Sequence, residues 1–145
     1  MSRKSSEVEL RTARFAGRRL DARYLGFFDA FNRQCFYEAH DVLEDLWLVD
    51  RNGPDGAFYK GLIQLAGAFV LLQKNRPRAA DRVFGLAEAN LRRYPNRHRA
   101  IELGPVQAIA AHWRNEFRLG NFGANPLAAS APPVLPWPDE TDPLG

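Results

Sequence analysis

The segment FYEAHDVLEDLW, residues 36–47, sets one imidazole and four carboxylates among apolar residues. These are the side chains that most often exchange protons or bind metal ions in proteins. On a helix, His40 and Glu44 lie one turn apart at one margin of an apolar stripe, and Glu38 lies at the opposite margin. The segment therefore predicts either a reactive site or a polar cluster that fixes the register of packed helices.

Metal binding is the first chemistry that this spacing suggests. His40 and Glu44, at i and i+4, can reach one ion, but a structural zinc site usually takes four protein ligands. Glu38 is at the wrong margin, Gln64 is a weak ligand, and the two other histidines are distant in the sequence. We therefore predict no bound metal and no other cofactor.

A general base is the second alternative, in which His40 accepts a proton and Glu44 orients its ring. No nucleophile accompanies them, since Cys35 precedes the helix and has the character of a small buried apolar residue. Two hypotheses follow for the set Glu38, His40, Glu44 and Gln64. In the preferred one, the set is a structural cluster in a non-catalytic module that binds a protein partner or itself. In the alternative, it serves a metal-dependent or general-base hydrolase, so enzymatic activity is left open.

Partly buried carboxylates need hydrogen-bond partners. Gln64, inside an otherwise apolar helix, is one such partner. Lys60, one turn before it, and the hydroxyl of Tyr59 are others. We predict that His40, Glu44 and Gln64 lie on facing surfaces of two helices and are largely buried.

All of the segments that must position these residues are predicted to be helices. Apolar residues recur at helical spacing over about 21–32, 35–49 and 57–74, in a segment that starts at Asn75 or Arg76 with Pro77 in its first turn, and over about 105–118. The third segment is apolar nearly all round, which predicts a buried central helix. No strand pattern is present. The sequence thus predicts an all-α fold, a single compact bundle of about five antiparallel helices.

Three regions are expected along the chain: a flexible basic N-terminus over 1–20, which is either frayed or a loosely attached helix, a helical-bundle domain over 21–120, and an extended Pro-rich tail over 121–145. The prolines of PPVLPWP exclude a helix there. Exposed Val134, Leu135 and Trp137 would be unfavourable in water, so we expect this tail to lie in a groove of its own bundle or of a neighbouring subunit.

Composition and charge limit the classes of function. One cysteine in 145 residues allows no internal disulfide and predicts a cytoplasmic location, and no apolar run is long enough for a membrane span. Residues 29–55 hold seven acids and two arginines, a net of −5, whereas residues 76–118 hold nine arginines and four acids, a net of +5. These halves can complement each other within the fold or across a homodimer. Nucleic acid is not the predicted partner, because the arginines lack interleaved aromatic residues of the stacking kind.

The stretches FNRQCFYEAHDVLEDLW, FYKGLIQLAGAFVLLQKNRPRAA and LRRYP together resemble the bacterial and archaeal family of unknown function numbered 309. The resemblance covers about Tyr24 to Phe117. It implies a compact all-α bundle of antiparallel helices without an assigned activity. The residues that match the family motif are Phe31, Asn32, Glu38, His40, Glu44, Trp47, Gly61, Gln64 and Tyr94. Asn32 and Trp47 thereby join Tyr59 and Lys60 as expected supports of the polar cluster. Gln34 and Cys35 depart from the usual Gly-rich turn.

Overall fold

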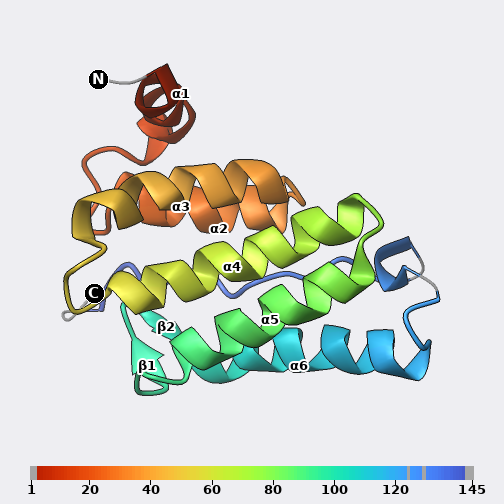
Figure 1. Ribbon diagram of the computed structural model, residues 1–145. Helices are drawn as coiled ribbons and strands as arrows, with labels where there is room; N and C mark the ends of the chain where they lie inside the picture. Colours follow the sequence, from red (N-terminus) through yellow and green to blue (C-terminus); the bar gives the residue numbers. More distant parts are fainter. Residues whose placement is uncertain (1–2, 124, 129, 143–145) are drawn as a thin grey trace.

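The computed structural model describes residues 3–123, 125–128 and 130–142. Within these residues, six α-helices and two 3-10 helices accompany one two-stranded antiparallel sheet (Figure 1). The elements are α1 (Arg3–Thr12), η1 (Ala13–Phe15), α2 (Ala22–Asn32), α3 (Phe36–Asp50), α4 (Gly56–Gln73), α5 (Pro77–Leu91), β1 (Arg97–His98), β2 (Ile101–Glu102), α6 (Leu103–Leu119) and η2 (Pro126–Ala128). Residues 1–2 of the predicted N-terminal segment, and 124, 129 and 143–145 of the predicted tail, lie outside the described residues.

The predicted helical fold class is confirmed, but the number of helices is larger than expected. The five predicted segments correspond to α2 to α6, and a sixth helix, α1, forms in the segment expected to be either frayed or a loosely attached helix. Val8 and Thr12 of α1 are buried, and a Thr12 methyl group lies over Gly26 of α2. The short β1–β2 hairpin was not predicted. Flexibility of residues 1–20 stays a prediction, as do the region boundaries.

Helices α3, α4 and α5 form one layer, with α2 and α6 behind it (Figure 1). Helices α3 and α4 are antiparallel, since Lys60 of α4 lies over Trp47 while Gly67 lies beside His40 of α3. Helices α4 and α5 are antiparallel as well, since Gln64 binds Asn90 while Phe69 packs against Phe84. Where α4 meets α5, a Cβ atom on Gly61 would lie 2.7 Å from Leu91 Cγ. Only glycine permits this approach, which offsets its low helix propensity.

Phe69 of α4 is the centre of the core. Its ring centroid lies 5.6 Å from Phe31 of α2, 4.9 Å from Phe36 of α3, 5.0 Å from Phe84 of α5 and 5.2 Å from Trp113 of α6. Most of these pairs are edge-to-face, the arrangement that the ring quadrupole favours. One aromatic residue thus ties together all five of the helices whose apolar stripes the sequence displays.

Three helices end in the same hydrogen-bonded motif with a left-handed residue after the cap. These residues are Gln34 (φ 65°), Asn75 (φ 57°) and Asn121 (φ 51°). At α2, Gln34 N–H donates to Phe31 O, and the next amide donates to Ala30 O. This Schellman pattern satisfies the last carbonyls of the helix and usually places glycine at the left-handed position.

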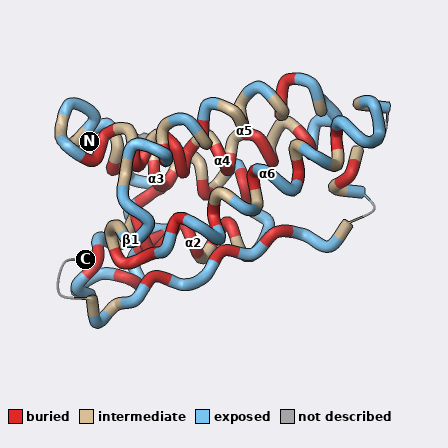
Figure 2. The backbone as a smooth tube through the Cα atoms, turned by 90° about the horizontal axis from the view of Figure 1, so that it is seen from below, coloured by how far each residue is buried: buried red, intermediate tan, exposed pale blue. Residues whose placement is uncertain are grey.

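The chain after α6 returns along the rear of α4 (Figure 1). In this stretch Pro133, Leu135 and Pro138 are buried, while Val134 and Trp137 are exposed (Figure 2). Leu135 is bound through its main chain to Asn32 of α2. Asp139 N–H donates to Ala100 O, so the same stretch also reaches the hairpin. Among the helices that the structure describes, none is long and apolar enough to cross a membrane.

Candidate functional site

Most of the predicted site residues lie along one outward-facing line where α3 meets α4. We call this line the α3–α4 seam. It is formed by His40, Glu44 and Trp47 of α3 and by Lys60, Gln64 and Gly67 of α4. His40 Cδ2 lies 3.7 Å from the position that a Cβ on Gly67 would take. Lys60 Nζ lies 4.4 Å from the centre of the Trp47 ring, a cation–π contact between the two helices.

The four core members of the predicted cluster nevertheless bind different partners. His40 Nδ1 lies 3.1 Å from Oδ1 of its neighbour Asp41, and Gln64 Oε1 accepts a hydrogen bond of 2.7 Å from Asn90 of α5. Glu38 faces away from the seam. Its carboxylate lies 3.4 Å from Arg11 and 3.6 Å from Arg33 at the end of α2. Glu44 lies half-buried on α3. Gln64 therefore links α4 to α5 rather than to α3.

His40, Glu44 and Gln64 were expected to be largely buried, but all three are only half-buried. Neither α2 nor α6 covers this side of the α3–α4–α5 layer, so the seam opens to solvent. Tyr59, expected to support the cluster, is instead buried on the inner side beside Tyr24, with ring centroids 6.2 Å apart. Burial there raises the pKa of Tyr59 to about 12.

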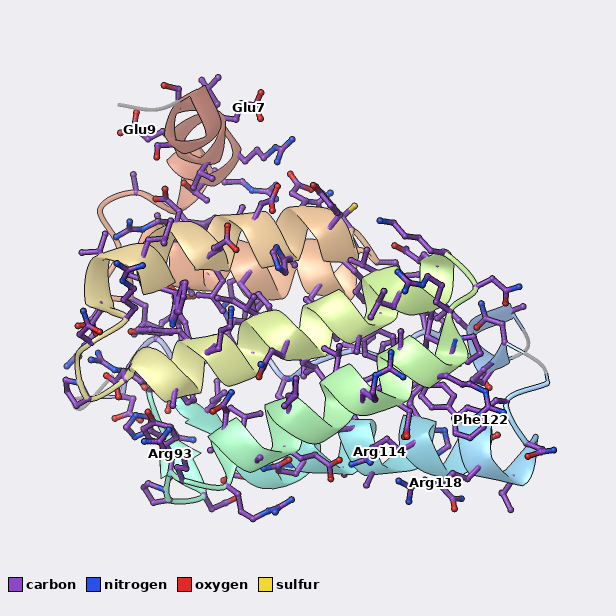
Figure 3. All side chains as sticks on the ribbon, viewed as in Figure 1. Glu7, Glu9, Arg93, Arg114, Arg118 and Phe122 are labelled. Carbon is purple, nitrogen blue, oxygen red and sulfur yellow. The ribbon has the colours of Figure 1, made fainter. Side chains whose placement is uncertain are left out.

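The charges of the acidic segment 29–55 are balanced mainly from the N-terminal part of the chain. Arg14 binds Asp29, and Arg23 binds Asp45 at 3.0 Å. On the basic side, Arg114 of α6 (labelled in Figure 3) binds two acids of α5, at 2.9 and 2.6 Å. The expected complementarity between the two halves is therefore largely replaced by local ion pairs.

A second polar group, which the sequence did not reveal, joins the acidic and basic halves. Asp55, directly before α4, is buried, with 5% of its surface exposed. Its Oδ1 lies 2.7 Å from His98 Nε2 on β1, and its Oδ2 accepts a 2.7 Å hydrogen bond from Arg99 Nε. We call Asp55, His98 and Arg99 the hairpin triad. An imidazole held by a buried carboxylate is the arrangement that orients a histidine for proton transfer.

Asp55 is free to bind the hairpin because another residue caps α4. An aspartate in this position usually accepts a hydrogen bond from a first-turn amide, but Asp55 makes no such bond. The hydroxyl of Tyr94 accepts instead from Phe58 N–H at 3.0 Å and donates to Pro54 O at 2.8 Å. A tyrosine from the chain after α5 thus performs the capping, and both oxygens of Asp55 turn to His98 and Arg99.

The turn of the hairpin has a strained backbone. Arg99 (φ 48°) and Ala100 (φ 67°) are both left-handed, where Asn-Gly is the usual pair for a two-residue turn. Each such residue costs about 1–2 kcal/mol relative to the right-handed region. Tyr24 O–H donates to Arg99 O at 2.7 Å, and Asp139 N–H donates to Ala100 O at 2.8 Å. Strain that surrounding contacts hold in place is typical of functional sites.

The electrostatics of the triad favour the ionised carboxylate. Burial by itself would raise the pKa of Asp55, but hydrogen bonds from His98 and Arg99 and the positive charge of Arg99 outweigh it. The net result is a pKa below the ordinary value of 3.8. Asp55 is therefore an anion at neutral pH and can only accept hydrogen bonds.

The triad borders a cavity of about 810 Å³. Its walls come from the α3–α4 loop, the hairpin and the C-terminal stretch, and they consist of Pro54, Asp55, Pro95, Arg97, His98, Arg99, Asp139, Thr141 and Asp142. This volume is in the range of small-molecule sites. Over the described parts of the chain, three or more His, Cys, Asp or Glu side chains nowhere gather in a way that could hold a metal ion.

Residues 24–83 match the family described as Domain of unknown function (DUF309). The resemblance is confirmed. The DUF309 match ends at Val83, short of Phe117, so it contains Asp55 and the α3–α4 seam but not His98 or Arg99. The motif residues themselves stay predictions.

One curated relative is an "Uncharacterized protein" of Aquifex aeolicus (strain VF5), 29% identical over 92 residues. The aligned part covers 63% of this chain and 28% of that relative, so the chain spans little more than a quarter of the relative's length. No solved structure matches the chain significantly. Neither the DUF309 segment nor this relative brings an assigned activity.

Proposed function

We propose that this chain is a self-associating helical module that forms a homodimer through the outward face of α3, α4 and α5. In this proposal the polar residues of the α3–α4 seam fix the geometry of the interface and have no catalytic role. The observation that carries it is a pair of complementary stripes, one acidic and apolar on α3, the other basic and apolar on α5.

The outward stripe of α3 consists of Tyr37, Asp41, Glu44 and Leu48, which lie at helical spacing. Tyr37 is 62% and Leu48 50% exposed, although both are large apolar side chains. Tyr37 stacks beside His40, with 6.4 Å between ring centroids, so the stripe adjoins the seam. Apolar residues grouped with acids in this way favour a partner surface that is both apolar and basic.

The outward stripe of α5 has that composition. Arg78, Arg82, Leu86 and Asn90 follow one another at intervals of four residues, and Leu86 is 54% exposed. Asn90 binds Gln64, so this stripe adjoins the other side of α4. The Arg78 guanidinium lies 4.7 Å from the centre of the Phe122 ring of its own chain. Within the described residues, no ion pair joins Arg82 to a carboxylate, so Arg82 is the cation that this stripe offers to a second copy.

The order of the helices suits a twofold axis. Helices α3 and α5 flank α4 and run in the same direction, because both are antiparallel to it. Two copies can stack with their outward faces together and a twofold axis between them, parallel to α4. This axis places α3 of the first copy on α5 of the second, and α5 of the first copy on α3 of the second. The start of α3, with Asp41, then meets the start of α5, with Arg82.

Light scattering tests this proposal. The chain of 16.4 kDa should have twice that mass in solution, and Leu86→Glu should reduce it to the monomer mass. The matched control is Leu119→Glu, since Leu119 is an exposed leucine on α6, outside the proposed face. A wild-type monomer at micromolar concentration contradicts the proposal.

A charge exchange makes the test specific to the proposed pairing. Asp41→Arg and Arg82→Asp should each weaken the dimer, and the double variant should recover it, because the opposite charges meet again. If the double variant is weaker than either single variant, α3 does not face α5. We also propose a cytoplasmic location, supported by the single thiol of Cys35.

A further inference from the structure

We propose that the cavity beside the β1–β2 hairpin is a hydrolytic site, in which His98 acts as a general base on a small carboxylic ester. The site is separate from the dimer face and does not depend on it. The sequence suggested His40 for such a role. In the structure, the carboxylate beside the His40 ring is that of its chain neighbour Asp41. His98 has the buried carboxylate that His40 lacks.

The ring of His98 is held on three sides. Phe58 packs against it edge-on with 4.9 Å between centroids, and Tyr94 lies on it with 4.8 Å between centroids. Asp55 fixes Nε2 at 2.7 Å. A catalytic side chain must have its rotamer fixed by such packing and by hydrogen bonds from behind, because a small misplacement costs much of the rate. Asp55 is thus a positioning residue.

The hydrogen bond to Asp55 also decides which nitrogen is the base. An ionised carboxylate has no proton to donate, so Nε2 carries the hydrogen of the neutral imidazole and Nδ1 carries the lone pair. Within the part of the chain that the structure describes, Nδ1 has no hydrogen-bond partner, and it is not among the buried unpaired atoms. Since His98 borders the cavity, Nδ1 is accessible to water and to a small substrate there.

Arg97 supplies the positive charge that such a reaction needs. Its Nη2 lies 3.1 Å from a carboxylate oxygen of Asp139 and 3.1 Å from one of Asp142, both of which line the same cavity. The guanidinium therefore already presents donors toward oxygen atoms in this space. The pair with Asp139 is exposed on both sides, so a substrate oxygen can replace that carboxylate at little cost.

The proposed reaction uses water and an ester and needs no other reactant. His98 Nδ1 takes a proton from a water molecule while the water oxygen bonds to the ester carbonyl carbon, and the carbonyl oxygen becomes an oxyanion beside Arg97. When the carbonyl re-forms, the carbon–oxygen bond to the alcohol breaks. The proton on Nδ1 passes to the departing alkoxide, which gives one carboxylic acid, one alcohol and neutral His98.

Hydrolysis of p-nitrophenyl acetate tests the proposal in the full chain. The wild-type rate should exceed that of equimolar free imidazole and should saturate with substrate. His98→Gln keeps an amide that can donate to Asp55, so it should retain the wild-type melting temperature while kcat/KM falls at least about 100-fold. His112→Gln, at an exposed histidine of α6, is the matched control and should hydrolyse the ester at the wild-type rate.

Two readouts separate chemistry from simple anchoring of the hairpin. Free imidazole should restore hydrolysis to His98→Ala, and nitrogen-15 spectra should show the Nε2–H tautomer of His98 in the wild type and its loss in Asp55→Asn. The proposal is overturned by a wild-type rate no higher than that of imidazole, by a folded His98→Gln variant with full activity, or by an equal loss of activity in His112→Gln. Hairpin variants that change only the melting temperature likewise leave the triad as an anchor.

Discussion

Asn32 binds the main chain of Leu135 with both ends of its carboxamide. Its Nδ2 donates to Leu135 O at 2.9 Å, and Leu135 N–H donates to its Oδ1 at 2.8 Å. One side chain of α2 thus replaces a strand partner for a segment 103 positions later in the chain. Asn32 was expected to support the polar cluster of α3, but in the structure it holds the C-terminal stretch against the rear of the helical layer.

We expect Asn32→Ala to lower the free energy of unfolding by about 1–3 kcal/mol, because both polar groups of the Leu135 main chain lose their partner. Hydrogen exchange should detect the change directly, as faster exchange of the Leu135 amide. Asn115→Ala, at an exposed asparagine of α6, should leave this amide protected. Equal protection in Asn32→Ala and the wild type would show that the carboxamide does not hold the segment.

Gln34→Gly should stabilise the chain by about 0.5–1 kcal/mol. Gln34 has φ 65° at the end of α2, a conformation in which its Cβ is disfavoured and a glycine is not. Part of the gain is offset by the greater freedom of glycine in the unfolded chain. Urea unfolding measures the difference. Asn75→Gly, at the equivalent position after α4, should gain less, since asparagine tolerates this conformation better. A destabilised Gln34→Gly variant would contradict this account.

The Gln64–Asn90 pair should contribute a measurable coupling between α4 and α5. We expect Gln64→Leu and Asn90→Leu each to cost about 1 kcal/mol, and the double variant to cost less than their sum by about 0.5–1.5 kcal/mol. A double-mutant cycle from denaturant unfolding gives the coupling. Strict additivity would mean that the 2.7 Å hydrogen bond contributes nothing to stability.

Stability should depend on pH through Asp55. The pKa of Asp55 is lowered in the folded chain from its ordinary value of 3.8, so its contribution is present above that pH and is lost as the pH falls through the folded value. Asp55→Asn removes the contribution at every pH. The difference in unfolding free energy between wild type and Asp55→Asn should therefore be largest near neutral pH and shrink below 3.8. Urea unfolding from about pH 6 to about pH 2 measures it, and a constant difference would refute the assignment.

Helices α2 to α6 could be predicted because each carries a continuous apolar stripe bounded by loop residues. The periodicity of α4, for example, predicted 57–74, and the helix spans Gly56–Gln73. Helix α1 lacks this signal: Val8 and Thr12 are buried, whereas Leu10 is 80% exposed. The hairpin was missed for a related reason, since its turn residues Arg99 and Ala100 are not those that favour a left-handed backbone.

The candidate site was only partly predictable. The spacing in α3 placed His40 and Trp47 correctly beside α4, because helical geometry fixes neighbours within one element. It did not show that Gln64 bonds to α5, since a helix surrounded by others offers several neighbours. The pairing of Asp55 with His98 joins residues 43 positions apart and depends on Tyr94 capping α4, which no local pattern encodes.

The packing order described for the helices bears on how fast the chain folds. Each of α2 to α5 packs against the helix that follows it. Most of the core thus forms between segments close in sequence, and proteins dominated by such local contacts fold in microseconds to milliseconds. The contacts of Asn32 with Leu135 and of Ala100 with Asp139 need partners on surfaces that exist only after the helices have packed. Refolding should therefore show a fast phase for the helical layer, followed by a slower step in which the C-terminal stretch closes over its rear.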